Sequence, residues 1–427
     1  MNSTVYKNTI QIYEYDWLKV GDTNRHGFQF NANHFTALDI YLTHNTSCGF
    51  FRIFHNKIQF CNYVGVIKVG NLIIEVLPKT DKNNEPKEVW QNVLLEMLKV
   101  SLKVNAKTTT HANIQLSNHS VLETYLQLFL NEVKNLLHEG LVKKYRQIQS
   151  NENVLKGKLL IQKQVSKNLV HAEKFYVAHQ VYNRDNIYNF IILETIHCIQ
   201  TLNVSSNISM QCKTLLLDFP ECSRIPISEK VFSSLIYGRK TERYKAALDL
   251  ARIILLNYHP DIKSGQNNIL AIMFDMNLLW ENYIYYIVKT SSLKNDKIIS
   301  VTAQSKKYFW SHDDNWKFRL KPDIFVQTKN NGNIILDTKW KYQKETSIED
   351  IRQMYAYSKY FEANENYLVY PDTNVIDVIK RKGKFYNPQK DGEFDTNSCG
   401  LMFVNLLENG KLNSLIGLKI VERINTT

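Results

Sequence analysis

The chain has 427 residues, of which 44% are hydrophobic and 12% aromatic. A chain of this length exceeds one ordinary domain, and its composition excludes a protein that is disordered throughout. Fifty-three Lys and Arg residues against 41 Asp and Glu residues give a formal charge of +12. Such a charge favours a polyanionic partner, although a general excess of Lys that serves only solvation is the alternative.

The six cysteines are scattered, without a C-x-x-C pair or a histidine at metal-ligand spacing. This pattern argues against a zinc module and a disulfide framework, and it fits a reducing cytoplasm. Met1–Tyr15 lacks an apolar signal core, and no run approaches the roughly 20 apolar residues that span a bilayer. We therefore expect a cytoplasmic protein without membrane contact.

The N-terminal part has the pattern of a β-rich module. Strands are expected within Phe28–Lys79, with a two-residue turn at Gly70-Asn71 and a stop at Pro78. The polar segment Asp81–Glu85 interrupts this pattern. We assign residues 1–95 to this module.

The next part of the chain is predicted to be mainly helical, because apolar residues recur there at three- and four-residue spacing. The segments with this spacing are Glu88–Val104, Val121–Leu137 and Tyr244–Leu256. Val177–Cys198 is predicted to form a strand and then a helix, and Pro260–Gln266 a linker. We assign residues 96–262 to a helical middle region and residues 263–427 to a C-terminal domain.

The long apolar stretch Asn268–Lys289 is predicted to form a buried helix. Glu281 would lie on the face of this helix that carries Phe274, Ile284 and Val288. A carboxylate on such a face is either paired for structural reasons or binds a metal ion or a water molecule. Both interpretations stay open.

The segment that follows predicts a β-hairpin. Lys321–Gln327 forms a strand entered through a proline, Asn330–Asn333 is a turn, and Ile334–Trp340 is the returning strand. The two-residue period of a strand places Asp337 and Lys339 on one face. Antiparallel pairing would bring Asp323 alongside them.

Two carboxylates and one ammonium group would then meet at one point. Asp323 and Asp337 offer the oxygen ligands that Mg²⁺ takes, together with waters and phosphate oxygens. Lys339 would position an attacking water or stabilise the developing negative charge. The alternative is an ion pair on an ordinary hairpin surface. The apolar neighbours of Asp337 instead indicate a buried strand, where charges need a reason.

A helix with two further polar residues is predicted downstream. Ser347 and Asp350 have the spacing of a capping box at its start. Gln353 and Tyr357 are four residues apart and share a face. The alternative for this pair is an exposed polar face without a function.

A strand at Tyr367–Tyr370, ended by Pro371, is expected after this helix. Hairpin, crossover helix and strand together give the α/β core expected of a metal-dependent nuclease. The whole chain is accordingly predicted to be a mixed α/β protein.

Basic and aromatic residues surround this core in the sequence and suit contact with a nucleic-acid backbone. They are Lys306, Lys307, Lys317, Arg319, Lys321 and Lys341, with Trp310, Trp316 and Trp340 among them. Trp340 fits a core position equally well.

Pro322-Asp323 followed by Asp337-Thr338-Lys339 resembles the PD-(D/E)xK nuclease motif, and Gln353 with Tyr357 resembles the Q-x-x-x-Y helix of its RecB-like branches. Most of the chain from about residue 58 onward is similar to the McrC family. The segments that carry this similarity are Asn62–Ile67, Ile74–Lys79, Val154–Leu159, Arg184–Asn189, Tyr244–Leu256, Phe274–Glu281 and Asp350–Tyr357.

The resemblance to McrC implies the endonuclease subunit of a two-component restriction system that cuts double-stranded DNA. It implies a partner, a McrB-like AAA+ GTPase hexamer, which binds the GTP and recognises DNA, often through modified cytosine such as 5-methylcytosine. The N-terminal module and the middle region would dock on that partner and stimulate its GTPase.

The resemblance also implies that the C-terminal domain is a PD-(D/E)xK restriction-endonuclease-like domain that uses Mg²⁺, or Mn²⁺ in its place. Asp323 and Asp337 would hold the metal. We expect Asp323, Asp337, Lys339, Gln353 and Glu281 to be the catalytic residues, and Lys321, Lys341 and Tyr357 to contact the DNA.

The chain has no G-x-x-x-x-G-K-[ST] loop of its own, and Ser233–Thr241 resembles only the end of one. The nucleotide is therefore expected on the partner. Two other functions stay open, a regulatory subunit that has lost its nuclease activity and a stand-alone RecB-like exonuclease. The intact set of acids and lysine argues against the first, and the long N-terminal region argues against the second.

Overall fold

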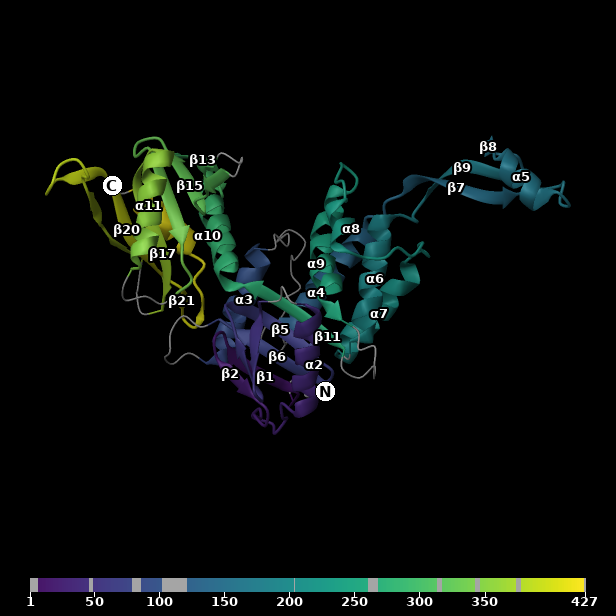
Figure 1. Ribbon diagram of the computed structural model, residues 1–427, viewed down its shortest axis with the longest axis horizontal. Helices are drawn as coiled ribbons and strands as arrows, with labels where there is room; N and C mark the ends of the chain where they lie inside the picture. The colour runs from purple at the N-terminus through teal and green to yellow at the C-terminus, as the bar shows by residue number, and fades with distance from the viewer. Residues whose placement is uncertain are drawn as a thin grey trace. The chain divides into compact units, whose positions relative to one another are not determined.

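The computed structural model describes residues 7–45, 49–78, 86–101, 121–202, 204–259, 268–312, 317–341, 346–373 and 378–425. Three features expected from the sequence, Asp81–Glu85, Pro260–Gln266 and Trp316, lie outside these residues. The described chain is a mixture of helices and strands, which confirms the predicted mixed α/β class (Figure 1).

The chain forms two compact units that are not consecutive in sequence. The first consists of Leu122–Ile272, and the second contains the described residues within Tyr6–Val121 and Met273–Thr427. The N-terminal module and the C-terminal domain therefore belong to the same unit. The division into domains at residues 1–95, 96–262 and 263–427 stays a prediction.

The N-terminal module contains two small sheets. In the first, β6 (Leu72–Leu77) pairs in parallel with β1 (Thr9–Tyr13) and antiparallel with β5 (Tyr63–Val69). The predicted turn joins β5 to β6 through Gly70, whose φ of +57° is a conformation that favours glycine. The second sheet has the order β2 (Trp17–Lys19), β4 (Lys57–Phe60), β3 (Phe51–Phe54).

One helix interrupts the region that the sequence assigns to strands. α2 (Ala32–His44) begins after Asn31, whose side chain accepts a hydrogen bond from the His34 backbone N–H while the His34 ring accepts one from the Asn31 N–H. This reciprocal cap stabilises the first turn. The prediction of strands throughout Phe28–Lys79 is therefore wrong here.

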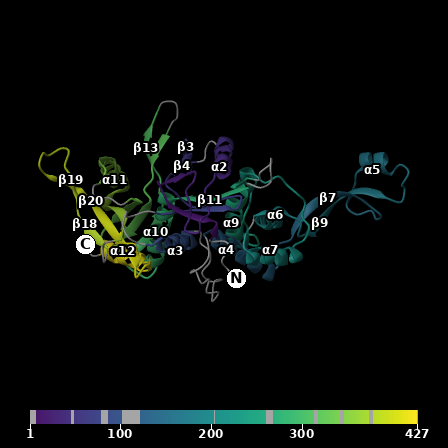
Figure 2. The same cartoon turned by 90° about the horizontal axis from the view of Figure 1, so that it is seen from below.

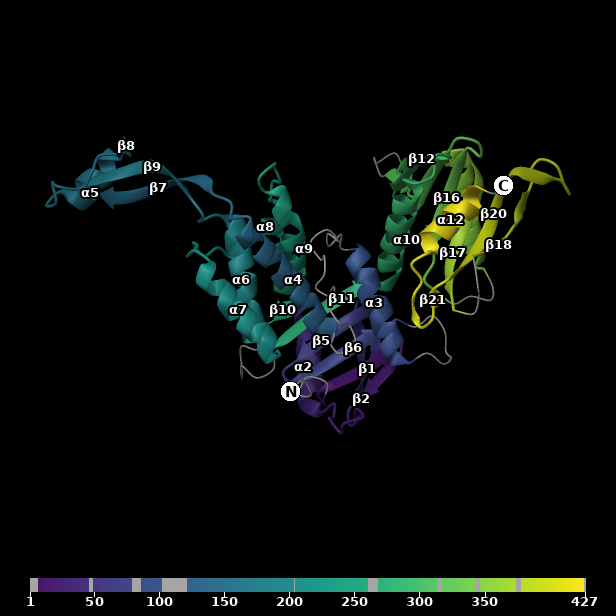
Figure 3. The ribbon, with the colours of Figure 1, turned by 180° about the vertical axis from the view of Figure 1, so that it is seen from behind.

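Three helices predicted from apolar spacing are confirmed. They are α3 (Lys87–Ser101), α4 (Val121–His138) and α9 (Lys245–Leu256). In the first unit, α6 (Ile187–Thr201) packs against α7 (Ser206–Asp218) and α9. A three-stranded arm extends from these helices and carries α5 (Ile161–Asn168) at its far end (Figure 3). Its strands are β7 (Lys144–Glu152), β9 (Phe175–Asn183) and β8 (Lys158–Leu159).

The C-terminal part is built around one mixed sheet. Its order is β12 (Ile298–Ala303), β15 (Ile324–Thr328), β16 (Asn333–Thr338), β17 (Ala363–Asp372), β20 (Phe394–Asn405), β18 (Ile379–Arg381), with β19 (Lys384–Tyr386) also on β20. β15 and β16 form the predicted antiparallel hairpin, and β16 is parallel to β17. α11 (Ile348–Phe361) connects these two parallel strands and packs on one face of the sheet. α10 (Met276–Ser292) and α12 (Ile416–Asn425) lie on the other face (Figures 1 and 3).

The predicted single helix over Asn268–Lys289 is wrong. Ile269–Asp275 is strand β11, and α10 begins at Met276. Asp275 separates the two because its side chain accepts hydrogen bonds from the N–H groups of Asn277 and Leu278, as an N-cap does. A short apolar run fits a buried strand as well as a buried helix, so the spacing of apolar residues could not separate them.

Pro371 does not end its strand as predicted. β17 continues to Asp372, and Pro371 pairs in register with Val404 of β20. On the other side, the pairing with β16 has already ended at Thr338↔Val369. Pro371 thus lies where only one neighbouring strand remains, as expected for proline in a sheet.

Candidate active site

The two aspartates predicted to hold a metal lie at the same end of the β15–β16 hairpin. Ile324 of β15 pairs with Leu336 of β16. Asp323 comes just before Ile324 and Asp337 just after Leu336, so in this antiparallel pair both aspartates lie at the same end. Asp337 is 1% exposed. One oxygen of Asp323, Oδ2, accepts hydrogen bonds from the Thr338 backbone N–H at 2.7 Å and from its hydroxyl at 2.9 Å.

Lys339 forms ion pairs with Asp337 and Asp350 through its ammonium group. Its Nζ lies 2.8 Å from Asp337 Oδ2 and 3.4 Å from Asp350 Oδ1. The backbone N–H of Lys339 donates to Val369 O at 2.9 Å, which attaches it to β17. The side chains of Asp337 and Lys339 are only 2% and 22% exposed, so this pair is not an ion pair on the protein surface.

α11 supplies the next two predicted residues. Gln353 accepts a hydrogen bond from Lys339 Nζ at 3.3 Å through its side-chain oxygen and donates through Nε2 to the Tyr357 hydroxyl at 2.7 Å. The Tyr357 hydroxyl donates to Lys321 O at 3.1 Å. Tyr357 is buried, so the two residues form an internal chain of hydrogen bonds and not an exposed polar face.

Glu281 approaches the site from α10 through an intermediate residue. Its Oε1 accepts a hydrogen bond from Gln304 Nε2 at 2.7 Å, and the Gln304 backbone N–H donates to Asp323 O at 2.9 Å. Burial raises the pKa of Glu281, and the charge on Asp323 adds to that shift. The structure therefore places Glu281 in the electrostatic neighbourhood of Asp323.

The basic residues near the site differ in their surroundings. Lys341 Nζ lies 2.8 Å from Asp350 Oδ2, whereas Lys321 is exposed. Trp340 is 7% exposed and stacks edge-to-face on Trp280 at 5.4 Å between ring centroids. Trp340 is therefore a core residue, and Trp310 is an exposed one.

The family model described as "McrBC 5-methylcytosine restriction system component" matches residues 58–371. The chain belongs to this family. The match includes all of the predicted site residues, which lie between Glu281 and Tyr357. The predicted resemblance to McrC is confirmed.

Two solved structures from Thermococcus gammatolerans are similar to this McrBC-family chain. One is a half-complex from a tetradecameric assembly of McrB AAA+ hexamers with bound McrC, with a TM-score of 0.66, 18% identity, and coverage of 97% of this chain and 99% of that chain. The other is the McrBC complex, with a TM-score of 0.49, 20% identity, and coverage of 66% and 88%. No curated protein matches. The first likeness shows that the fold extends over nearly the whole chain.

Burial and neighbouring charges shift the pKa values of the site residues in this chain of the McrBC family. Burial, and then the neighbouring Asp323, raise the pKa of Asp337 to about 7. Burial also raises the pKa of Asp323, although the hydrogen bonds from Thr338 and the charge on Lys339 oppose the shift. Burial alone would lower the pKa of Lys339, but the charges on Asp337, Asp350 and Asp323 together raise it above its usual value. Lys339 is therefore an ammonium ion at neutral pH.

These residues fit a magnesium site. Asp337 is buried and Asp323 is partly buried, and both have raised pKa values. A cation bound between two such carboxyl groups would stabilise their ionised forms. Among the described residues, no group of three or more His, Cys, Asp or Glu side chains is arranged to hold a metal ion. Mg²⁺ needs no such cage, because it binds through one or two carboxylates and completes its shell with water and substrate phosphate oxygens.

Two site residues were not identified as such from the sequence. Asp350 was interpreted as part of a helix cap, but the cap at Ser347 receives the Glu349 N–H, and Asp350 instead binds Lys339 and Lys341. Its position three residues before Gln353 places both on one helix face, and this spacing was the available signal. The sequence around Gln304 does not indicate a site residue. Its backbone has a φ of +52°, a left-handed conformation that the fold imposes and that a glutamine does not predict.

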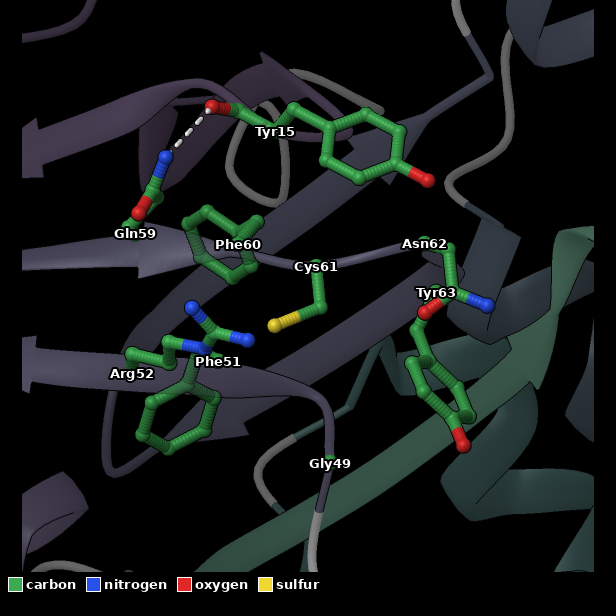
Figure 4. A pocket seen from close by; sticks show the side chains of 9 residues that line it. All are labelled: Tyr15, Gly49, Phe51, Arg52, Gln59, Phe60, Cys61, Asn62 and Tyr63. Carbon is green, nitrogen blue, oxygen red and sulfur yellow. Dashed lines mark hydrogen bonds between the residues drawn. The ribbon is translucent and has the colours of Figure 1, made fainter. Parts of the chain in front are cut away.

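A pocket in the N-terminal module is separate from these residues. It has a volume of about 510 Å³, and Figure 4 shows Arg52 and Cys61 next to each other among aromatic rings such as Phe60 and Tyr63. None of the predicted site residues lines it. None of its described lining residues carries a carboxylate, so they lack the metal-binding chemistry of the Asp323–Asp337 site. No described helix is long and apolar enough to cross a membrane.

Proposed function

We propose that this chain is the DNA endonuclease subunit of a McrBC-type restriction system and hydrolyses phosphodiester bonds with Mg²⁺. The observation that carries the proposal is the meeting of Asp323, Asp337 and Lys339 at one buried end of a hairpin. Membership of a family of restriction system components supports it.

Each side chain has a role in this proposal. Asp323 and Asp337 hold Mg²⁺, or Mn²⁺ in its place; when bound, such a cation neutralises phosphate charge and makes a bound water more acidic. Lys339 directs its ammonium group to the charge that develops on the phosphate. Gln353 and Asp350 hold that ammonium group in place. Glu281 and Gln304 orient water or support Asp323, and Lys321 and Lys341 lie along the DNA. Tyr357 is buried and acts through Gln353 instead of touching the DNA.

The proposal includes a partner. A solved structure with the same fold contains McrB AAA+ hexamers with bound McrC. By analogy, this chain binds a McrB-like hexamer in the cytoplasm, and that partner binds the GTP. The chain stimulates its GTPase, and the partner brings double-stranded DNA, often with modified cytosine, to the nuclease.

The test is cleavage of methylated plasmid DNA by the chain assembled with its AAA+ partner, GTP and Mg²⁺. We expect Asp337→Asn to abolish cleavage and to leave partner binding and GTPase stimulation intact. The matched control is Asp391→Asn, at an exposed aspartate of the same unit. EDTA added to the wild-type complex should stop cleavage as the substitution does.

The other outcomes separate the alternatives. Normal cleavage by Asp337→Asn would show that the site assignment is wrong. GTPase stimulation without cleavage by the wild-type chain would indicate the regulatory subunit. Degradation of DNA ends without partner or GTP would indicate the stand-alone exonuclease.

A further inference from the structure

A two-stranded hairpin beside the candidate active site exposes an unusual amount of aromatic surface. β13 (Lys307–Ser311) and β14 (Lys317–Leu320) pair only with each other among the described strands. Tyr308, Phe309, Trp310 and Phe318 are 58%, 47%, 48% and 55% exposed. A hairpin in water gains little stability by exposing such rings, and an exposed apolar patch of this kind marks an interaction site.

The hairpin is nevertheless held in a defined position. At its base, Lys307 Nζ donates to Tyr360 O of α11 at 2.7 Å, and Phe309 packs edge-to-face on Tyr360 at 5.3 Å. Farther along, the ring pair Trp310–Phe318 lies 5.6 Å apart. In Figure 2 the strand β13 projects from the part of the fold around α10. The aromatic pair is thus presented to solvent by a hairpin anchored on α11.

The two strands of the hairpin also carry positively charged side chains. Lys317 and Arg319 lie near the ring of Tyr308, with Arg319 4.4 Å from its centroid. Within the described part of the chain, Lys307, Lys317 and Arg319 form ion pairs with no carboxylate. Cations interleaved with exposed rings are the pattern of a nucleic-acid contact, where cations meet phosphates and rings meet bases or sugars.

The base of the hairpin adjoins the candidate metal ligands. β14 ends at Leu320, and only Lys321 and Pro322 separate it from Asp323. On the incoming side, the Gln304 N–H donates to Asp323 O at 2.9 Å. Both legs of the hairpin therefore leave the sheet beside Asp323. A protein docked on the hairpin would obstruct the approach of a phosphate to that carboxylate, which favours DNA as the occupant.

We propose that the β13–β14 hairpin grips duplex DNA next to the phosphate that is cut. Lys307, Lys317 and Arg319 contact backbone phosphates on either side of the site. Tyr308, Trp310 and Phe318 pack against sugars and base edges and fix the duplex against the Asp323–Asp337 pair. This inference rests on the proposed nuclease function and adds the element that holds its substrate.

The test measures binding of the full chain to a labelled duplex over a salt titration, with Ca²⁺ in place of Mg²⁺. Trp310→Ala with Phe318→Ala should weaken binding by about tenfold or more, because stacked aromatic contacts are lost. The matched control is Tyr386→Ala with Phe394→Ala, another exposed cross-strand ring pair, with centroids 5.0 Å apart. This control pair should bind DNA as the wild type does.

A second variant tests the charges independently of the rings. Lys317→Gln with Arg319→Gln should reduce the slope of log affinity against log salt by about 1.8, since each lost phosphate contact removes about 0.9. The control Lys384→Gln with Lys390→Gln, at two exposed lysines near the Tyr386–Phe394 pair, should leave the slope unchanged.

Several outcomes would overturn the inference. Wild-type affinity and slope in both hairpin variants would do so, as would absence of duplex binding by the wild-type chain at low salt. Loss of partner association or of self-association, with DNA binding unchanged, would assign the hairpin to a protein interface. A parallel assay measures DNA cleavage by the wild-type complex with Mg²⁺. If that complex cuts DNA, such a result overturns the inference about the hairpin and leaves the proposed function standing. If that complex does not cut, the proposed function fails.

Discussion

Asp337 combines burial with proximity to another carboxylate, and this has a consequence for stability. Its pKa is raised to about 7, first by burial and then by Asp323. In the unfolded chain an aspartate ionises near about 3.9. Between these two values the folded protein holds a proton that the unfolded chain releases, so stability falls as pH rises from about 4 to about 7.

We therefore expect Asp337→Asn to raise the melting temperature, measured in EDTA, more at pH above about 7 than at pH near about 4. Mg²⁺ should stabilise the wild type, more so at the higher pH, because protons compete with the metal for the carboxylates. Differential scanning calorimetry with and without Mg²⁺ measures both effects. Equal stabilisation of wild type and Asp337→Asn by Mg²⁺ would contradict the metal assignment.

Lys339 allows a prediction about rate. Replacing it with Gln removes the ammonium group that lies 2.8 Å from Asp337. We expect cleavage by the assembled complex to fall by about 10²-fold or more, in the range found when one electrostatic stabiliser is removed. Stability at neutral pH should also fall, because Asp337 remains buried without its partner.

The matched control is Lys341→Gln, at a lysine that binds Asp350 from a more exposed position. Its effect on single-turnover cleavage should be several times smaller. Similar losses in both variants would mean that Lys339 contributes charge to the region and has no specific role at the scissile phosphate.

At the scale of the element, side chains of α11 join the ends of β16 and β15 by hydrogen bonds. The chain of hydrogen bonds from Lys339 through Gln353 and Tyr357 reaches Lys321 O, just before Asp323. Tyr357→Phe keeps the buried ring and removes the hydroxyl. We expect a loss of about 1 to 2 kcal/mol in the free energy of unfolding, since Gln353 and Lys321 O each lose a partner.

Cleavage by Tyr357→Phe should fall modestly, because Gln353 no longer holds its orientation toward Lys339. Urea denaturation and single-turnover cleavage measure the two effects. Tyr355→Phe on the same helix, where the ring packs on Phe385, is the control and should change neither quantity. An unchanged unfolding free energy in Tyr357→Phe would show that this chain of hydrogen bonds is weak.

The elements that the sequence predicted well are those with a local chemical signal. The Asn330–Asn333 turn, the Ser347 cap and the strand alternation around Asp337 all depend on neighbouring residues, and the hairpin and α11 follow from them. The β11–α10 boundary was missed because an apolar run suits either structure until Asp275 is recognised as a cap. Helix α2 was missed because its cap partner at the third helical position is a histidine.

The residues of the candidate site also fall into two groups, those that local sequence patterns predicted and those that only the tertiary structure brings together. Asp323, Asp337, Lys339, Gln353 and Tyr357 lie within 35 residues of one another, and strand and helix periodicity brought them together correctly. Glu281 is connected to Asp323 only through Gln304, whose left-handed backbone is set by tertiary structure. The dual role of Asp350 required knowledge of how α11 lies on the sheet.

At the scale of the molecule, the second unit joins the N-terminal module to the mixed sheet of the C-terminal part through buried contacts. Trp340 Nε1 donates to Glu14 Oε1 at 2.8 Å, and both residues are buried. Asn62 Nδ2 donates to Asp275 Oδ2 at 3.0 Å, at the N-cap of α10. Because Trp340 directly follows Lys339, the N-terminal module supports the chain just beyond the end of β16.

We therefore expect Glu14→Leu to lower the free energy of unfolding by about 1 to 3 kcal/mol, because the indole N–H loses its acceptor in the core. It should also slow cleavage, because Lys339 is less firmly positioned. Glu14→Gln keeps an acceptor oxygen and should retain most of both properties. If Glu14→Gln were impaired as much as Glu14→Leu, the negative charge of Glu14 would be its important property.

The discontinuity of the second unit also affects how the chain is made. Glu14 and Trp340 are 326 positions apart, and closing so long a loop carries an entropic cost before the contact forms. During synthesis the first unit, Leu122–Ile272, leaves the ribosome complete, and domains generally fold as they emerge. The buried contacts of the N-terminal module with Asp275 and Trp340 form only after those residues have been made. A contact that supports the position of Lys339 is thus completed late in synthesis, although its acceptor Glu14 is made 326 positions earlier.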